Sequence, residues 1–182
     1  LTTIWDASCR TLAGLRTRVR TDATFAPYVL SLARNPEEDR GIRELAIIAL
    51  ADLCPEAVEE VRSIAVGDPS EQLRIEAVHV IKRTDTKADE FLRQVVLNDP
   101  YLDVRREALA ALSPEAMASP DTREMLARIH ETPLEIGKDG AVLGYETEFR
   151  EQALLTSYEC LLRSGSGGVS GVLAVCERYL AL

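Results

Sequence analysis

The sequence lacks the residue groupings from which most catalytic and metal sites are built. It holds only two histidines, His79 and His130, and they fall in different parts of the chain, so no metal or triad chemistry is predicted around them. Its four cysteines form no CxxC pair, which argues against a zinc motif and a dense disulfide framework. These cysteines are Cys9, Cys54, Cys160 and Cys176. We therefore expect no catalytic residue, no cofactor site and no metal site, and we expect buried, reduced cysteines.

Long apolar runs and positive net charge are also missing. No stretch approaches the roughly 18 residues of a membrane span, and no signal peptide is visible. The formal net charge is −9, and its field repels phosphate backbones, so nucleic-acid binding is not expected. Reduced cysteines favour the cytoplasm. The chain begins at Leu1 without Met and ends on an apolar tail, so we expect it to be part of a longer polypeptide.

Amphipathic segments rich in helix-forming residues make up most of the chain. Aromatic residues are only 5% of the sequence, whereas Ala, Leu, Glu and Arg are abundant, which favours helix over sheet. Apolar residues at helical spacing, bounded by Pro-containing breaks, predict a series of helices. These helices are expected at 3–19, 24–34, 37–53, 55–66, 70–83, 87–97, 101–112, 120–131, 146–163 and 169–182.

One short pattern recurs along these helices. An apolar residue precedes an Arg, an Ala follows three positions after that Arg, and a larger apolar residue comes next. The four copies begin at Ile42, Leu73, Val104 and Phe149, with spacings of 31, 31 and 45 residues. A 31-residue period that holds two helices is typical of an α-solenoid, in which each helix pair buries its apolar stripe against its neighbours.

Two of the copies also follow an Asp-Pro turn, at Asp68-Pro69 and at Asp99-Pro100. With this turn, the apolar-Arg step and the Ala, the unit resembles HEAT-like repeats of the bacterial and phycobilisome-lyase type. The resemblance implies an all-α fold, namely an α-solenoid of HEAT-like helix pairs that winds as a right-handed superhelix. It covers residues 24–182 as one continuous array, and residues 1–23 are then an N-terminal capping helix.

Two copies depart from the pattern of this family. The first has Asn35-Pro36 two residues too early, and in the fourth 14 extra residues replace the Asp-Pro turn. The repeated residues themselves have a structural explanation. The small Ala lets paired helices approach, and the Arg head can reach the turn Asp of an adjacent unit. A structural ladder is therefore favoured over a catalytic set for Asp68, Asp99, Arg74 and Arg105.

The outward positions of the second helix in each unit form the first candidate binding surface. They mix acidic, basic and apolar side chains without a basic stripe, so a protein or peptide partner fits better than DNA. One Glu recurs in each unit, and these carboxylates either are simply solvated or attract a basic peptide. The predicted contact residues on these helices are Glu44, Glu76, His79, Arg106, Glu107, Glu151 and Tyr158.

The interruption at residues 132–145 is the second candidate surface. Two apolar segments flank a Gly137–Gly140 turn, which predicts a small β-hairpin insert. An irregular loop in a regular array is often where function is added, so Lys138 and Asp139 join the predicted contact residues. The alternative is a neutral insertion.

These observations favour a non-enzymatic scaffold that binds a protein or peptide partner on the concave face, on the 132–145 loop, or on both. The first alternative is a bilin lyase-like subunit or another enzyme-associated HEAT protein, because related repeats occur in bilin lyases. The second is a sensory or structural domain of a larger protein. A DNA glycosylase of related fold is disfavoured by the acidic charge and by the single Trp5.

Overall fold

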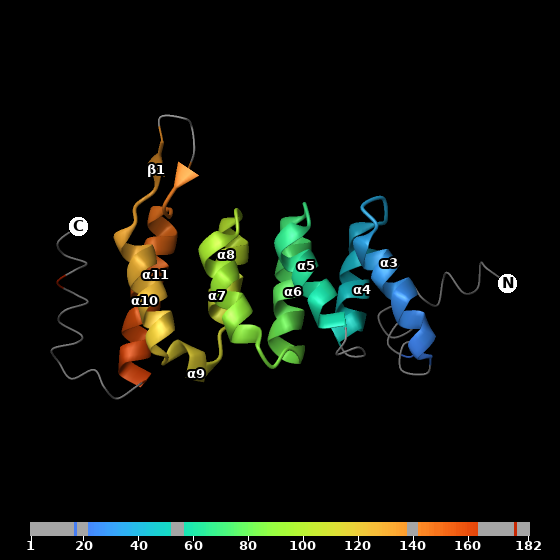
Figure 1. The fold of residues 1–182 in the computed structure, drawn as a ribbon. Helices are drawn as coiled ribbons and strands as arrows, with labels where there is room; N and C mark the ends of the chain where they lie inside the picture. Colours follow the sequence, from blue (N-terminus) through green and yellow to red (C-terminus); the bar gives the residue numbers. More distant parts are fainter. Residues whose placement is uncertain (1–16, 18–21, 52–56, 138–141, 164–176, 178–182) are drawn as a thin grey trace. The chain divides into compact units, whose positions relative to one another are not determined.

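The computed structural model describes residues 22–51, 57–137 and 142–163, together with Thr17 and Glu177 (Figure 1). The chain divides into two compact units, Leu1–Ala111 and Leu112–Leu182. Helices account for 78% of the structure, which confirms the predicted all-α fold class. The helices expected at 3–19 and 169–182 lie outside the described residues, apart from Thr17 and Glu177. Among the described helices, none has the length and apolar character to cross a membrane.

The first unit is built from successive helix pairs, after a short 3-10 helix η1 (Ala23–Phe25). In each pair a first helix packs against a second helix: α3 with α4, α5 with α6, and α7 with α8. The bounds are α3 Ala26–Arg34, α4 Arg40–Ala51, α5 Val58–Gly67, α6 Glu71–Thr84, α7 Ala88–Asn98 and α8 Leu102–Ala111. Each helix lies within a few residues of its predicted range.

The second helices of the pairs also pack on one another. In the first unit α4 contacts α6 and α6 contacts α8, whereas the described first helices α3, α5 and α7 have at most slight contact with each other. The second helices therefore form a continuous row, as expected for an α-solenoid.

The repeated Ala explains how these helices approach closely. Each one has no exposed surface, and this holds in all four copies of the pattern: Ala46, Ala77, Ala108 and Ala153. Larger apolar side chains around them, such as Leu73 and Ile81, are also completely buried. Tyr28 on α3 is 40% exposed, with its ring centroid 5.0 Å from that of Phe25.

The second unit contains one further helix pair, α10 (Pro120–Glu131) and α11 (Thr147–Arg163), preceded by the short helix α9 (Pro114–Met117). Serine side chains set the starts of α9 and α10. Ser113 Oγ accepts a hydrogen bond from Ala116 N at 3.1 Å, and Ser119 Oγ accepts one from Thr122 N at 3.2 Å. Each serine is followed by a Pro, which suits the first helical turn.

The predicted hairpin lies between α10 and α11 and extends beyond the ends of these helices (Figure 1). Strands β1 (Glu135–Ile136) and β2 (Val142–Leu143) pair antiparallel, with Glu135 opposite Leu143 and Ile136 opposite Val142. The hairpin prediction is therefore confirmed.

Candidate partner-binding surface

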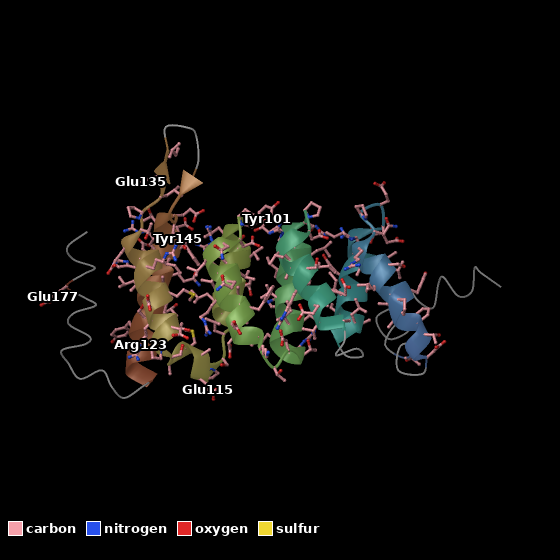
Figure 2. The ribbon with its side chains drawn as sticks, viewed as in Figure 1. Tyr101, Glu115, Arg123, Glu135, Tyr145 and Glu177 are labelled. Carbon is pink, nitrogen blue, oxygen red and sulfur yellow. The ribbon has the colours of Figure 1, made fainter. Side chains whose placement is uncertain are left out.

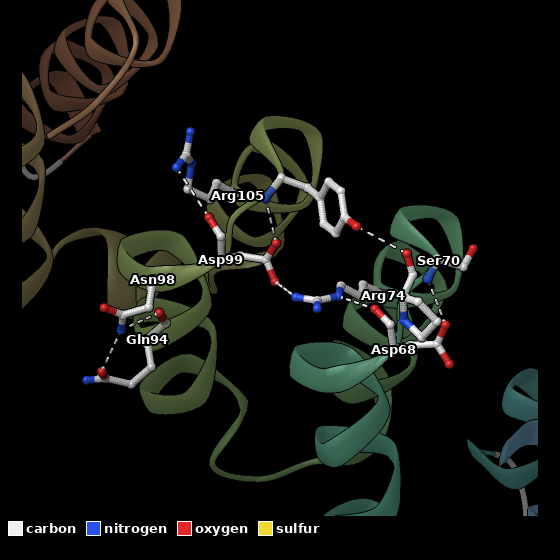
Figure 3. Close-up of polar contacts among 9 residues, drawn as sticks. Asp68, Ser70, Arg74, Gln94, Asn98, Asp99 and Arg105 are labelled. Atoms are coloured by element: carbon white, nitrogen blue, oxygen red, sulfur yellow. Dashed lines mark hydrogen bonds and ion pairs between the residues drawn. The ribbon is translucent and has the colours of Figure 1, made fainter. Parts of the chain in front are cut away.

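The repeated Arg and Asp form the arginine ladder, which we define as Arg43, Asp68, Arg74, Asp99 and Arg105. Figure 3 shows its centre, with Arg74 between Asp68 and Asp99. Arg74 Nε donates to Asp68 O at 2.6 Å, and Arg74 Nη1 donates to Asp99 Oδ2 at 2.7 Å. Arg74 therefore bonds the turn within its own helix pair, at Asp68, and the turn within the following pair, at Asp99. Arg43 repeats the arrangement, since its Nη2 pairs with Asp68 Oδ2 and its Nε donates to Ala33 O at 3.0 Å.

The turn aspartates use their second carboxylate oxygen locally. Asp68 Oδ1 accepts from Ser70 N, and Asp99 Oδ1 accepts from Tyr101 N, each at 2.9 Å. Both aspartates are buried, so these hydrogen bonds and the arginine contacts replace the water that a carboxylate needs. The predicted contact between the Arg head and the Asp of the next unit is therefore confirmed, and the ladder is part of the packing.

The 31-residue register brings His130 to the place of the turn Asp in the last described pair. His130 is the next-to-last residue of α10 and is buried. Arg150 Nε donates to His130 O at 2.8 Å, which is the same bond that Arg74 makes to Asp68 O. Sequence reasoning missed this equivalence because it searched for an Asp-Pro turn, whereas the bond needs only a backbone carbonyl.

The second-helix face, as we call the outward side of α4, α6 and α8, is accessible along its whole described length. No described residue of this face is buried. The face consists of Glu44, Leu45, Ile48, Ile75, Glu76, His79, Lys82, Arg106, Glu107 and Ala110. It combines half-exposed apolar side chains with charges of both signs.

Two of the predicted contact residues meet across neighbouring helices of this face. His79 Nε2 on α6 lies 3.0 Å from Glu107 Oε2 on α8, and both side chains are partly exposed. Glu76 is different, since it makes no hydrogen bond or ion pair with any residue that the structure describes. Glu76 and His79 both lie on α6 and Glu107 lies on the neighbouring α8, so all three side chains belong to the same face.

Two other predicted residues of the face have partners on their own helix. Glu44 Oε1 lies 3.3 Å from Arg40 Nε, and Arg106 Nη1 lies 3.3 Å from Asp103 Oδ1. In each pair one side chain is exposed and the other is partly buried. Ion pairs at the surface contribute little to stability, and a partner's charges can replace them.

The remaining predicted residues lie outside the three helices that form this face. Glu151 is exposed and Tyr158 is half-buried, and both lie on α11 in the second compact unit. Lys138 and Asp139 lie outside the described residues. The structure instead exposes two apolar side chains of the insert that the sequence analysis did not select, Leu134 at 44% and Ile136 at 77%. The sequence does contain a signal for them, because two apolar residues that lie two positions apart share one face of a strand.

No group of three metal-binding side chains occurs in the described parts of the chain. Comparison with known families matches residues 26–113 to HEAT repeats. The match is to HEAT repeats in general and gives no lyase subtype. No curated protein and no solved structure matches the chain.

Proposed function

We propose that this chain, whose residues 26–113 match HEAT repeats, is a non-enzymatic scaffold that binds a protein or peptide partner. HEAT repeats commonly mediate protein–protein interaction, and they are usually not enzymes. The proposed contact surface is the second-helix face, with the hairpin at 132–145 as a second contact.

The single observation that carries this proposal is the unbroken row of accessible side chains along α4, α6 and α8. The second helices contact each other more closely than the first helices do, which favours a solenoid whose second-helix side is the shorter one. A stack that is shorter on one side curves toward that side, which supports a concave second-helix face. A concave face can surround a peptide or a helix of a partner.

The chemistry of the face also fits a protein partner. Leu45, Ile48 and Ile75 are half-exposed, so a partner that covers them removes apolar area from water. Around them, Glu76 and Lys82 are charged groups that a partner of complementary charge can pair with. This mixture matches the composition of non-obligate protein interfaces, whereas a nucleic-acid surface would need a basic stripe.

The test is a triple charge reversal on the second-helix face, Glu44→Lys, Glu76→Lys and Glu107→Lys. The matched control reverses three carboxylates outside this face: Glu37, Glu59 and Glu90. Each immobilised variant is incubated with an extract of the native cells, and bound proteins are quantified by mass spectrometry against the wild-type chain. Circular dichroism checks that both variants remain helical.

We expect proteins retained by the wild-type chain to be lost with the first variant and kept with the control. A reversal of three charges changes both the attraction and the desolvation at the centre of the proposed contact. Equal retention by both variants contradicts the second-helix face as the contact surface.

A further inference from the structure

The hairpin is fixed at its base and is a built element of the second unit. Tyr145 N donates to Thr132 O at 3.1 Å, and the buried Tyr145 ring lies 6.0 Å from the ring of Phe149 on α11. Gly144 has φ +84°, and a Cβ placed there would lie 2.1 Å from Pro133 O. This close approach requires glycine. Figure 2 labels Tyr145 at this base and Glu135 on the strand above it.

The anchored base supports an apolar surface that no described part of the chain covers. Leu134 and Ile136 are two residues apart on an extended segment, so they lie on the same face, with Glu135 on the other. The exposed fraction of Ile136 is 77%, the largest among the exposed large apolar side chains of the described residues. Beyond the pairing of β1 with β2, neither strand has more than slight contact with any other described element.

The outer edge of β1 is also open. Apart from the pairing with β2, no hydrogen bond of residues 134–136 to another described residue is found. An extended segment with unpaired backbone groups and an exposed apolar face can accept another strand.

The charge around the hairpin indicates the chemistry of that strand. The described residues 131–137 and 144–149 carry four carboxylates and no Lys, Arg or His. The carboxylates are Glu131, Glu135, Glu146 and Glu148. A strand with Lys or Arg beside its apolar residues is therefore attracted, and an acidic strand is repelled.

From these observations we propose that β1 is a docking edge for a partner protein, which adds a β-strand with apolar residues at alternate positions and basic residues between them. The apolar residues of that strand cover Leu134 and Ile136, and its backbone pairs with the open edge of β1. This inference rests on the proposed function in that the hairpin is one of the two contact surfaces of the scaffold.

The experiment uses the whole 182-residue chain and synthetic peptides of about eight residues, a usual strand length. The first peptide alternates Val and Lys, and the second alternates Val and Glu. The third is the Val–Lys peptide with N-methyl groups along one backbone edge, which removes its donors without changing its charge. Binding is measured by fluorescence anisotropy of the labelled peptides.

We expect the Val–Lys peptide to bind at least about tenfold more tightly than both other peptides. We expect Ile136→Ser to weaken this binding about tenfold as well, because the apolar contact is lost while the net charge is unchanged. The matched control is Val66→Ser on α5, where Val66 is 51% exposed, and it should leave binding unchanged. Both substitutions are at exposed positions, and circular dichroism verifies the fold.

Three results overturn the docking edge: no binding of the Val–Lys peptide, equal binding of its N-methylated form, or no effect of Ile136→Ser. The triple reversal of the second-helix face separates this inference from the proposed function. If that reversal abolishes peptide binding while Ile136→Ser does not, the second-helix face is the site and only the docking edge fails. If Ile136→Ser weakens peptide binding and the triple reversal does not, the docking edge is supported, and this result does not depend on what the second-helix face binds.

Discussion

The regular pair α5–α6 and the interrupted pair α10–α11 share the same hydrogen bond between their two helices, although the sequences that connect the helices differ. In each pair an arginine of the second helix donates Nε to a backbone carbonyl within one residue of the last residue of the first helix. Arg74 and Asp68 are six residues apart, whereas Arg150 and His130 are 20 residues apart. The extra 14 residues are therefore inserted without loss of this contact.

The comparison separates what holds a pair together from what links successive pairs. A carbonyl acceptor is available from any residue, so Asp68 and His130 serve equally within their pairs. The carboxylate of Asp68 does something more, because it also pairs with Arg43 of the preceding pair. We infer that the Arg-to-carbonyl bond closes each pair and that the Asp side chain links pairs into an array.

The largest expected effect is at the centre of the regular array. Arg74→Ala removes the partner of the buried Asp99 carboxylate, so a buried charge is left uncompensated. We expect the free energy of unfolding to fall by about 3–5 kcal/mol, measured by urea denaturation. The control is Arg123→Ala at an exposed position, with a change within about 0.5 kcal/mol. An equally small effect at Arg74 would show that the ladder does not stabilise the array.

The next effect is at the base of the insert. Gly144→Ala places a methyl group against Pro133 O and forces a non-Gly residue to positive φ. We expect a cost of about 2 kcal/mol, seen as faster hydrogen exchange of Tyr145 N–H, which bonds Thr132 O. Gly67→Ala is the control, because a Cβ at Gly67 meets nothing within 4 Å. Unchanged exchange at Tyr145 in the Gly144 variant would mean that the base is not tightly closed.

The third effect tests the closure of the interrupted pair. Arg150→Ala removes the hydrogen bond to His130 O from a half-buried side chain. We expect a loss of about 1–2 kcal/mol in urea denaturation, smaller than at Arg74 because no buried carboxylate is left behind. Arg128→Ala, at an exposed position of α10, is the comparison variant. A loss at Arg150 as large as that at Arg74 would contradict the separation of closure from linkage.

The smallest effect is on the second-helix face. A double-mutant cycle with His79→Ala and Glu107→Ala should give a coupling energy of about 0.2–1 kcal/mol, because both side chains are partly exposed. A coupling well above this range would mean that the pair is structural and is not available to a partner.

Much of this organisation could be predicted from the sequence, because it depends on periodic residues. The 31-residue register placed Ala46, Ala77 and Ala108 in the core, and the recurrence of Arg74 and Asp99 predicted their contact. Both follow from the rule that each repeat contacts only its neighbours.

The predictions were weakest where the repeat is broken. An apolar pair two residues apart, such as Leu134 and Ile136, normally indicates a strand with one buried face, and only the fold shows that this hairpin extends away from the helices. The contact of His79 with Glu107 also depends on a neighbouring helix, which no local pattern specifies. The contact residues predicted on the second-helix face therefore remain proposals.

The central claim is that the regular contacts hold the fold and that the insert adds a binding surface. The most direct measurement replaces residues 134–143 with Asn-Gly, a favoured two-residue hairpin turn, and keeps Gly144 and Tyr145. Thermal unfolding and Val–Lys peptide binding are then measured on the same sample. We predict a melting temperature within a few degrees of the original, since the replaced Leu134 and Ile136 are exposed, together with loss of peptide binding. Retained binding, or loss of cooperative unfolding, would contradict this claim.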